Sequence, residues 1–215
     1  MGGSLLFVSE KPGVVQCTMR RKGSKSHTTR AKTAQRVKRG KQLVFLFGKE
    51  RDCDANPGWS DFGGGTDSGE SFLETAIREG SEELTGFLGS EQNVRAYIRA
   101  AIKHSKTHEL YTIQYLPREP KYSTYCVHII PVPYQDFAML AQYYNNNQAF
   151  LQKRLSAQLI RDSKIFEKQE IRWFTWSEMA RRRHEFRVFY RDIIDLLLAQ
   201  RKRIEVYARQ VLMLS

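Results

Sequence analysis

The chain has 215 residues, of which 41% are hydrophobic and 12% are aromatic. This length fits one domain with extensions rather than two large domains, and the aromatic content excludes a wholly disordered chain. The chain carries 35 Lys and Arg against 23 Asp and Glu, and the resulting net charge of +12 favours a polyanionic partner.

The three cysteines, Cys17, Cys53 and Cys126, stand far apart in the sequence. Their number and spacing suit neither a disulfide framework nor a zinc site, so we expect a reducing, intracellular setting, either cytoplasmic or nuclear. The first residues lack the basic leader of a signal peptide, and no apolar stretch approaches the roughly 18 residues that span a bilayer. We therefore expect no membrane partner.

Short runs of β-branched and aromatic residues at 13–19 and 42–48 predict two paired strands. Between them, residues 20–41 include ten Lys or Arg and no acidic residue. A segment of like charge cannot bury itself, so we expect a mobile basic loop inserted between the two strands. Five of its residues are our candidates for contacting an anionic substrate: Arg20, Arg21, Lys22, Lys38 and Arg39.

Residues 50–69 are dense in Gly, Asp, Asn and Pro, which predicts a long loop with a functional role. Residues 70–84 follow the helical period, because Leu73, Ala76 and Ile77 recur at three- and four-residue spacing. The other face of this predicted helix carries glutamates. A glycine-rich loop therefore leads directly into a helix with one acidic face.

The second half of the chain alternates predicted strands and helices. Apolar and aromatic runs predict three strands, at 110–117, 122–132 and 170–176. Helical periodicity predicts three helices, at 134–143, 149–161 and 185–213. The asparagines at 145–147 are expected to separate the first two helices, which together form a helical insertion over 134–161.

Glu79, Glu82 and Glu83 lie three and four residues apart on the predicted helix, so their carboxylates project from one face. Three negative charges that close repel one another, and we expect a cation to compensate them. Hard oxygen ligands select Mg²⁺ or Mn²⁺ over softer metals. Mg²⁺ held by few carboxylates keeps coordination sites for substrate phosphates. The alternative is a solvated acidic surface.

Residues 64–83, which we call the box, follow the pattern G-x5-E-x7-R-E-x2-E-E. This pattern resembles the signature of the Nudix hydrolases, which cleave nucleoside diphosphates linked to another group. The resemblance implies one α/β domain over 1–215, an α-β-α sandwich with a mixed sheet. The helical insertion and a long C-terminal helix would be added to this core. The reaction implied is attack of water on a diphosphate linkage, with Mg²⁺ or Mn²⁺ as cofactor.

The resemblance also implies roles for individual residues. The metal ligands would be Glu79, Glu82, Glu83 and the carbonyl of Gly64. Glu70 would support the loop and contribute to metal binding. Arg78 would hold a carboxylate by a bidentate contact, which suits its planar guanidinium, and a catalytic role is the alternative.

The general base of several Nudix enzymes is a glutamate outside the box, ahead of the last helix. The segment around 170–176 resembles that region, and Glu170 is our first candidate, with Glu167 second. The alternatives are that Glu170 only flanks a strand, or that the box supplies its own base. Trp59, ahead of the glycines, is a candidate for stacking on a substrate base or for packing the loop onto the sheet.

The excess of positive charge is the guide to the substrate. A second basic region lies near the C-terminus, in Arg181, Arg182, Arg183, Arg187, Arg191, Arg201, Lys202, Arg203 and Arg209. A long polyanion gains most from so broad a field, which favours the capped 5′ end of RNA, as in Nudix decapping enzymes. Diphosphoinositol polyphosphates and dinucleoside polyphosphates are alternatives, as is an RNA-binding module with a vestigial box. The sequence does not define the oligomeric state.

Overall fold

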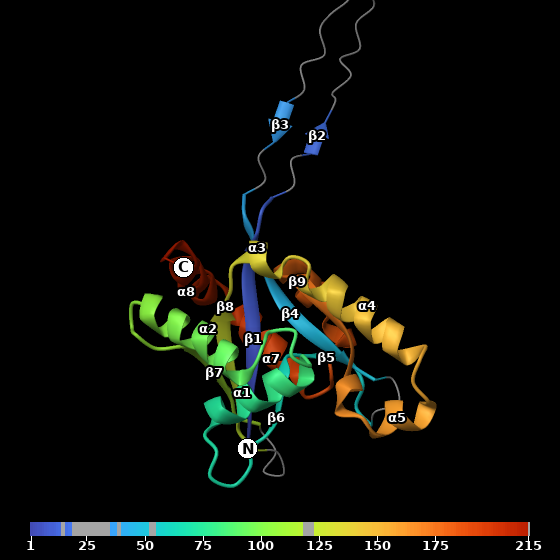
Figure 1. Cartoon of the computed structure of the whole chain (residues 1–215). Helices are drawn as coiled ribbons and strands as arrows, with labels where there is room; N and C mark the ends of the chain where they lie inside the picture. The colour runs from blue at the N-terminus through green and yellow to red at the C-terminus, as the bar shows by residue number, and fades with distance from the viewer. Residues whose placement is uncertain (14–15, 19–34, 38–39, 52–54, 118–122, 215) are drawn as a thin grey trace, which may run out of the picture.

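The computed structural model describes residues 1–13, 16–18, 35–37, 40–51, 55–117 and 123–214. They form a mixed α/β fold in which helices cover both faces of a mixed sheet (Figure 1). The expected fold class is therefore confirmed. No helix among the described residues has the length and apolar character needed to cross a membrane.

The main sheet is built around β1 (Gly2–Lys11), and its strand order is β5-β4-β1-β8-β7. β1 pairs in antiparallel fashion with β4 and β6 and in parallel with β8, while β9 pairs with β4. The bounds of the other strands are β4 Gln42–Glu50, β5 Trp59–Ser60, β6 Phe62–Gly65, β7 Tyr111–Tyr115, β8 Tyr125–Pro131 and β9 Lys168–Thr175. A separate two-stranded sheet joins β2 (Gln16–Thr18) to β3 (Gln35–Val37).

Successive side chains of a strand point to opposite faces, and β1 feeds two cores in this way. Leu6 and Val8 belong to one core, and Leu5 and Phe7 to the other. All four side chains are fully buried. This central strand therefore reads as a continuous apolar run rather than as an alternating one.

The core containing Leu5 is covered by α1 (Phe72–Glu83), α2 (Glu91–His104), α3 (Tyr134–Phe137) and α4 (Leu140–Gln152). The opposite core is covered mainly by α6 (Trp176–Arg181), α7 (Tyr190–Ala199) and α8 (Arg201–Leu214). Short helical segments complete the described elements: α5 Ala157–Asp162, η1 Lys164–Phe166 and η2 Arg183–Glu185.

Several sequence-based predictions are confirmed. The strands expected at 42–48, 110–117, 122–132 and 170–176 appear as β4, β7, β8 and β9. The amphipathic helix expected at 70–84 is α1. Ser71 is its N-cap residue, and its side chain accepts a hydrogen bond from the backbone N–H of Glu74. Such a cap satisfies a free donor at the start of the helix.

The predictions for the N-terminal third are partly wrong. β4 pairs with β1, β5 and β9, and not with the segment at 13–19, whose described part pairs with β3 instead. Of the expected basic loop at 20–41, the described residues include β3, and most of the loop lies outside them. The segment 50–69 is not a continuous loop, because it contains β5 and β6.

The expected break at the three asparagines is also wrong. α4 runs through residues 145–147 without interruption. The Asn145 side chain accepts a hydrogen bond from the backbone N–H of Ile171 (2.9 Å) and donates one to the carbonyl oxygen of the same residue (3.0 Å). These bonds satisfy backbone groups of β9, so the residue that favours a break in isolation joins α4 to the sheet.

The long helix expected at 185–213 is two helices, α7 and α8, which meet at Gln200. The Gln200 side chain accepts a hydrogen bond from the hydroxyl of Tyr111 (2.7 Å), which ties this break to β7. The sequence analysis also missed β1 and α2.

Candidate active site

The box begins on β6, continues through the loop after it and ends on α1. Ala76, Ile77 and Gly80 of α1 are buried, and Glu83 is buried with them, whereas Glu79 and Glu82 are only partly buried. β6 pairs with the start of β1, where Gly64 lies opposite Gly3. The strand that begins the box and the helix that ends it therefore both lie against the first half of β1.

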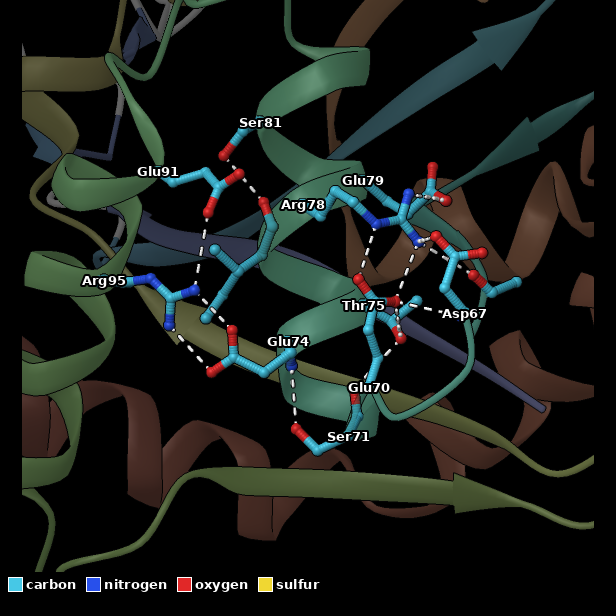
Figure 2. A network of polar contacts seen from close by, with 12 residues as sticks. Asp67, Glu70, Ser71, Glu74, Thr75, Arg78, Glu79, Ser81, Glu91 and Arg95 are labelled. Carbon is cyan, nitrogen blue, oxygen red and sulfur yellow. Dashed lines mark hydrogen bonds and ion pairs between the residues drawn. The ribbon is translucent and has the colours of Figure 1, made fainter.

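Arg78 organises the first half of the box (Figure 2). Its Nε donates to Glu70 Oε1 (2.9 Å) and its Nη2 to Glu70 Oε2 (3.1 Å), which is the bidentate contact expected from the sequence. Glu70 also accepts hydrogen bonds from the Asp67 N–H and the Thr75 hydroxyl. The hydrogen bonds from Arg78, above all, lower the pKa of Glu70 to about 2. Glu70 is thus held as a carboxylate.

Arg78 also holds Glu79, because its Nη1 donates to Glu79 Oε1 at 2.7 Å. The Glu79 carboxylate lies directly on the backbone of Gly64: a Cβ added to residue 64 would come 2.5 Å from Glu79 Oε1. Only glycine leaves room for this contact. Two residues from opposite ends of the box are therefore in direct contact.

Glu83 is buried at the end of α1, with 6% of its surface exposed. Its Oε2 accepts a hydrogen bond from the Gly63 N–H (3.0 Å), and its Oε1 forms an ion pair with Lys168 Nζ (3.0 Å). Desolvation raises the pKa of Glu83, and the charge of Lys168 opposes that rise. Both of its oxygens are engaged by the protein itself.

Glu82 is half-buried and points elsewhere. It lines a cavity of about 430 Å³ together with Ser81, Thr85, Asn147, Leu151 and Ile165. This cavity lies between α1, α4 and η1. Among the residues that the structure describes, no three His, Cys, Asp or Glu side chains converge as a metal site.

The expectation that a cation compensates the acidic face stays a prediction, and two cations of the chain itself already lie against two of the carboxylates. Arg78 compensates Glu79, and Lys168 compensates Glu83. Whether these residues could bind a metal ion depends instead on which oxygen atoms lie close to one another. Glu79 presents a carboxylate beside the backbone of Gly64, and Glu82 lies three residues further along α1, where it faces the cavity between α1, α4 and η1. Carboxylate and carbonyl oxygens are the kind of ligand that hard cations prefer. Glu83, bound to Lys168, does not fit that set.

The two candidates for the general base lie in different surroundings. The charge of Glu167 acts on Glu83, whose pKa it raises. Glu170 lies on β9 opposite Lys49, and its charge raises the pKa of Arg182, which follows α6. The second candidate, Glu167, is therefore electrostatically coupled to Glu83.

Trp59 is a core residue, so of its two expected roles the contact with a substrate base is wrong and the packing role is confirmed. The side chain is 3% exposed, and its ring packs edge-on against Phe174, with centroids 4.9 Å apart. This outcome is the packing alternative that the sequence analysis also considered. The proposed substrate contacts in the basic loop, Arg20, Arg21, Lys22, Lys38 and Arg39, lie outside the described residues.

Several arginines of the C-terminal basic region are paired within the chain. Arg182 binds Glu185, Arg183 binds Asp195, and Arg187 binds Glu50. Arg191 donates to the backbone carbonyls of His184 and Phe186. These contacts hold η2 and α7 in place, so this part of the positive charge is not freely available to a ligand.

A basic cavity lies at the other end of β1. It measures about 650 Å³, and its charged lining residues are Lys11, Lys41, Arg172, Glu178, Arg201, Glu205 and Arg209. Five of these side chains are cations and two are carboxylates, and ion pairs join Arg172 to Glu178, Arg201 to Glu205, and both Lys41 and Arg209 to Glu10. Gly3 and Lys11 are eight residues apart on β1, and at about 3.3 Å per residue the cavity is roughly 26 Å from the box along the strand. The two features are thus at opposite ends of the sheet.

Sequence reasoning missed Lys168, the buried partner of Glu83. A single lysine at the start of a strand carries no pattern that identifies it, and its partners are far away in the sequence. Glu50 was likewise not identified. Only the tertiary structure brings these residues together.

No family model matches the sequence, and no curated protein matches it as a relative. Among solved structures, the chain is similar to a mutT/nudix family protein from Listeria innocua, with 13% identity, a TM-score of 0.45 and 95% of each chain covered. It is also similar to NrtR of Shewanella oneidensis, with 13% identity and a TM-score of 0.38. That match covers 94% of this chain and 63% of NrtR.

Proposed function

We propose that the protein is a pyrophosphohydrolase of the Nudix type, which uses Mg²⁺ or Mn²⁺ to cleave a diphosphate linkage with water. One observation carries the proposal. Arg78 contacts both Glu70 and Glu79, and Glu79 lies against Gly64, so residues spaced along the whole box meet at one point. A merely solvated acidic helix does not need its carboxylates held in this way.

Glu79, Glu82 and the carbonyl of Gly64 would hold the cation. Bound there, a divalent ion would stabilise negative charge on the diphosphate oxygens and lower the pKa of an attacking water. Arg78 keeps the Glu79 carboxylate oriented toward Gly64, and Glu70 in turn orients Arg78. The role of Arg78 is thus positioning, exerted through Glu79.

Glu167 is the better candidate for accepting the proton of the attacking water. It lies close enough to the buried end of the box to influence the pKa of Glu83. Glu170 is on a strand position opposite Lys49 and acts on Arg182 instead. A Glu167→Gln variant that hydrolyses substrate as fast as the wild type would return the role to Glu170 or to the box itself.

For the substrate, we propose the capped 5′ end of an RNA. The net charge of +12 and the cationic cavity at the far end of β1 both favour a long polyanion that extends beyond the box. A small diphosphate bound at the box does not reach a cavity roughly 26 Å away. RNA bound at both places spans that distance with a few nucleotides.

A panel of substrates tests the proposal. We would assay the protein with Mg²⁺ and with Mn²⁺ on capped RNA, free cap dinucleotide, a dinucleoside polyphosphate and a diphosphoinositol polyphosphate. Release of the cap nucleoside diphosphate from RNA, faster than from free cap, is the expected result. Preference for either small polyphosphate would replace the RNA assignment. Binding of RNA without hydrolysis of any substrate would instead identify an RNA-binding module with a vestigial box.

A further inference from the structure

Lys168 is the first residue of β9, and its side chain is completely buried. Its ammonium group forms ion pairs with Glu50 and with Glu83 Oε1 (3.0 Å) and lies 3.2 Å from the Ser60 hydroxyl. Burial alone would lower the pKa of Lys168, but the two carboxylates outweigh it and raise the pKa. The geometry thus places a buried ammonium group between two carboxylates.

The surroundings are shaped for this lysine. Gly48, on the neighbouring strand β4, leaves space for its aliphatic stem: a Cβ there would come 2.8 Å from Lys168 Cδ. Tyr144 of α4 donates its hydroxyl to the carbonyl of Lys168 (2.9 Å) and lies 3.3 Å from the carbonyl of Glu83. Contacts from β4, α1 and α4 thus fix both partners of the ion pair.

The charges of this buried cluster balance. Glu50 and Glu83 are the two carboxylates, and Lys168 and Arg187 are the two cations, since Arg187 Nη1 donates to Glu50 Oε1 at 2.8 Å. A buried charge is tolerated when it is paired and its remaining hydrogen-bonding capacity is used. Glu83 meets both conditions through Lys168 and the Gly63 N–H. It needs no metal ion.

We propose that Lys168 is a built-in cation of the box, which takes the place of a divalent ion at Glu83. Glu83 then acts as a positioning residue that anchors Gly63 and β6, while binding of a divalent ion depends on Glu79 and Glu82. The inference rests on the proposed function, because it concerns the same box. It differs from the resemblance to the Nudix signature, which implies that Glu83 is a ligand.

The test is Mn²⁺ binding, measured by isothermal titration calorimetry and by electron paramagnetic resonance of free Mn²⁺, on folded protein without substrate. We compare the wild type with Glu79→Gln and Glu83→Gln. Glu79→Gln is expected to weaken binding by more than about tenfold, as loss of a ligand does, and Glu83→Gln to leave affinity within about threefold. Equal weakening in the two variants would overturn the inference while leaving the proposed function intact.

Lys168→Met provides a second, independent readout. Removal of the ammonium group leaves Glu83 and Glu50 with one compensating cation, so the variant is expected to bind one more Mn²⁺ per chain than the wild type. An unchanged stoichiometry in a variant that circular dichroism shows to be folded would contradict the inference. If the wild type bound no Mn²⁺ at millimolar concentration, the proposed function would fail as well, and that outcome is distinct from the others.

Discussion

The carboxylate of Glu79 lies against the backbone of Gly64, with no room for a side chain between them. Gly64 is on β6 and Glu79 on α1, so this contact joins the strand and the helix that carry the box. It depends on Arg78, which holds the other side of the same carboxylate. A single methyl group added at residue 64 disturbs this contact.

Gly64→Ala is expected to displace the Glu79 carboxylate, because the new Cβ would lie 2.5 Å from Oε1. We expect the rate of hydrolysis to fall by more than about tenfold, since displacing a group of the active site by about 1 Å has a large effect on rate. Gly65→Ala is the matched control, because a Cβ there meets no atom within 4 Å. Equal rates for the two variants, at equal melting temperatures, would contradict a functional role for the contact.

Arg78→Lys is expected to reduce hydrolysis by roughly 10- to 100-fold, because lysine cannot keep two charge-assisted hydrogen bonds to Glu70 worth about 1.5–3 kcal/mol each. The measurement is kcat/KM, with the wild type alongside. Arg95→Lys is the control: Arg95 binds Glu74 through both of its terminal nitrogens, on another side of α1 (Figure 2). Loss of activity in both variants would indicate a general effect of helix stability.

Asp61 predicts a pH dependence of stability. It is buried at the junction of β5 and β6, where Ser4 of β1 and Tyr125 of β8 donate hydrogen bonds to it, and desolvation raises its pKa from 3.8 to about 6. The folded protein therefore holds this proton more tightly than the unfolded chain. The stability that protonation contributes is complete below about pH 3.8 and is lost as pH rises through about 6.

Asp61→Asn removes this titration. The free energy of unfolding of the variant, relative to the wild type, is expected to rise by about 2 kcal/mol between pH 4 and pH 7, since one pKa unit corresponds to about 1.4 kcal/mol and pH 4 lies just above the unfolded pKa. Urea denaturation at a series of pH values measures the difference. A difference that stays constant over this range would contradict the burial of an ionisable Asp61.

Asn145 tests the link between α4 and β9. Asn145→Ala leaves the N–H and the carbonyl of Ile171 without their partners, which is expected to destabilise the protein by about 1–3 kcal/mol. Asn146→Ala, an exposed change on the same helix, serves as the control and should alter stability by less than about 0.5 kcal/mol. Chemical denaturation of both variants gives the comparison.

The parts of the fold that were predicted correctly have local signals. The helix at 72–83 has its apolar period and the Ser71 cap within a dozen residues, and the strands at 42–50 and 125–131 are dense apolar runs. The fold class and the bidentate contact of Arg78 followed from the same stretch of sequence. Such features depend on neighbours along the chain.

The parts that were missed depend on distant residues. β1 is recognised as the central strand only when β4, β6 and β8 are placed around it. Asn145 favours a helix break until the edge of β9 offers it two hydrogen bonds. Lys168 lies 118 positions from Glu50 and 85 positions from Glu83 in the sequence, and no periodic pattern predicts these ion pairs. In each of these three cases the structure depends on tertiary contacts that the local sequence does not reveal.

If the box is a metal-dependent hydrolytic site, diphosphate cleavage must depend on the carboxylate of Glu79. Initial rates of diphosphate cleavage are measured with Mn²⁺ for the wild type, Glu79→Gln and Glu74→Gln, the last a control on the same helix that lies against Arg95. We predict cleavage by the wild type and by Glu74→Gln, and a loss of more than about 100-fold in Glu79→Gln. Wild-type rates in Glu79→Gln would contradict the account.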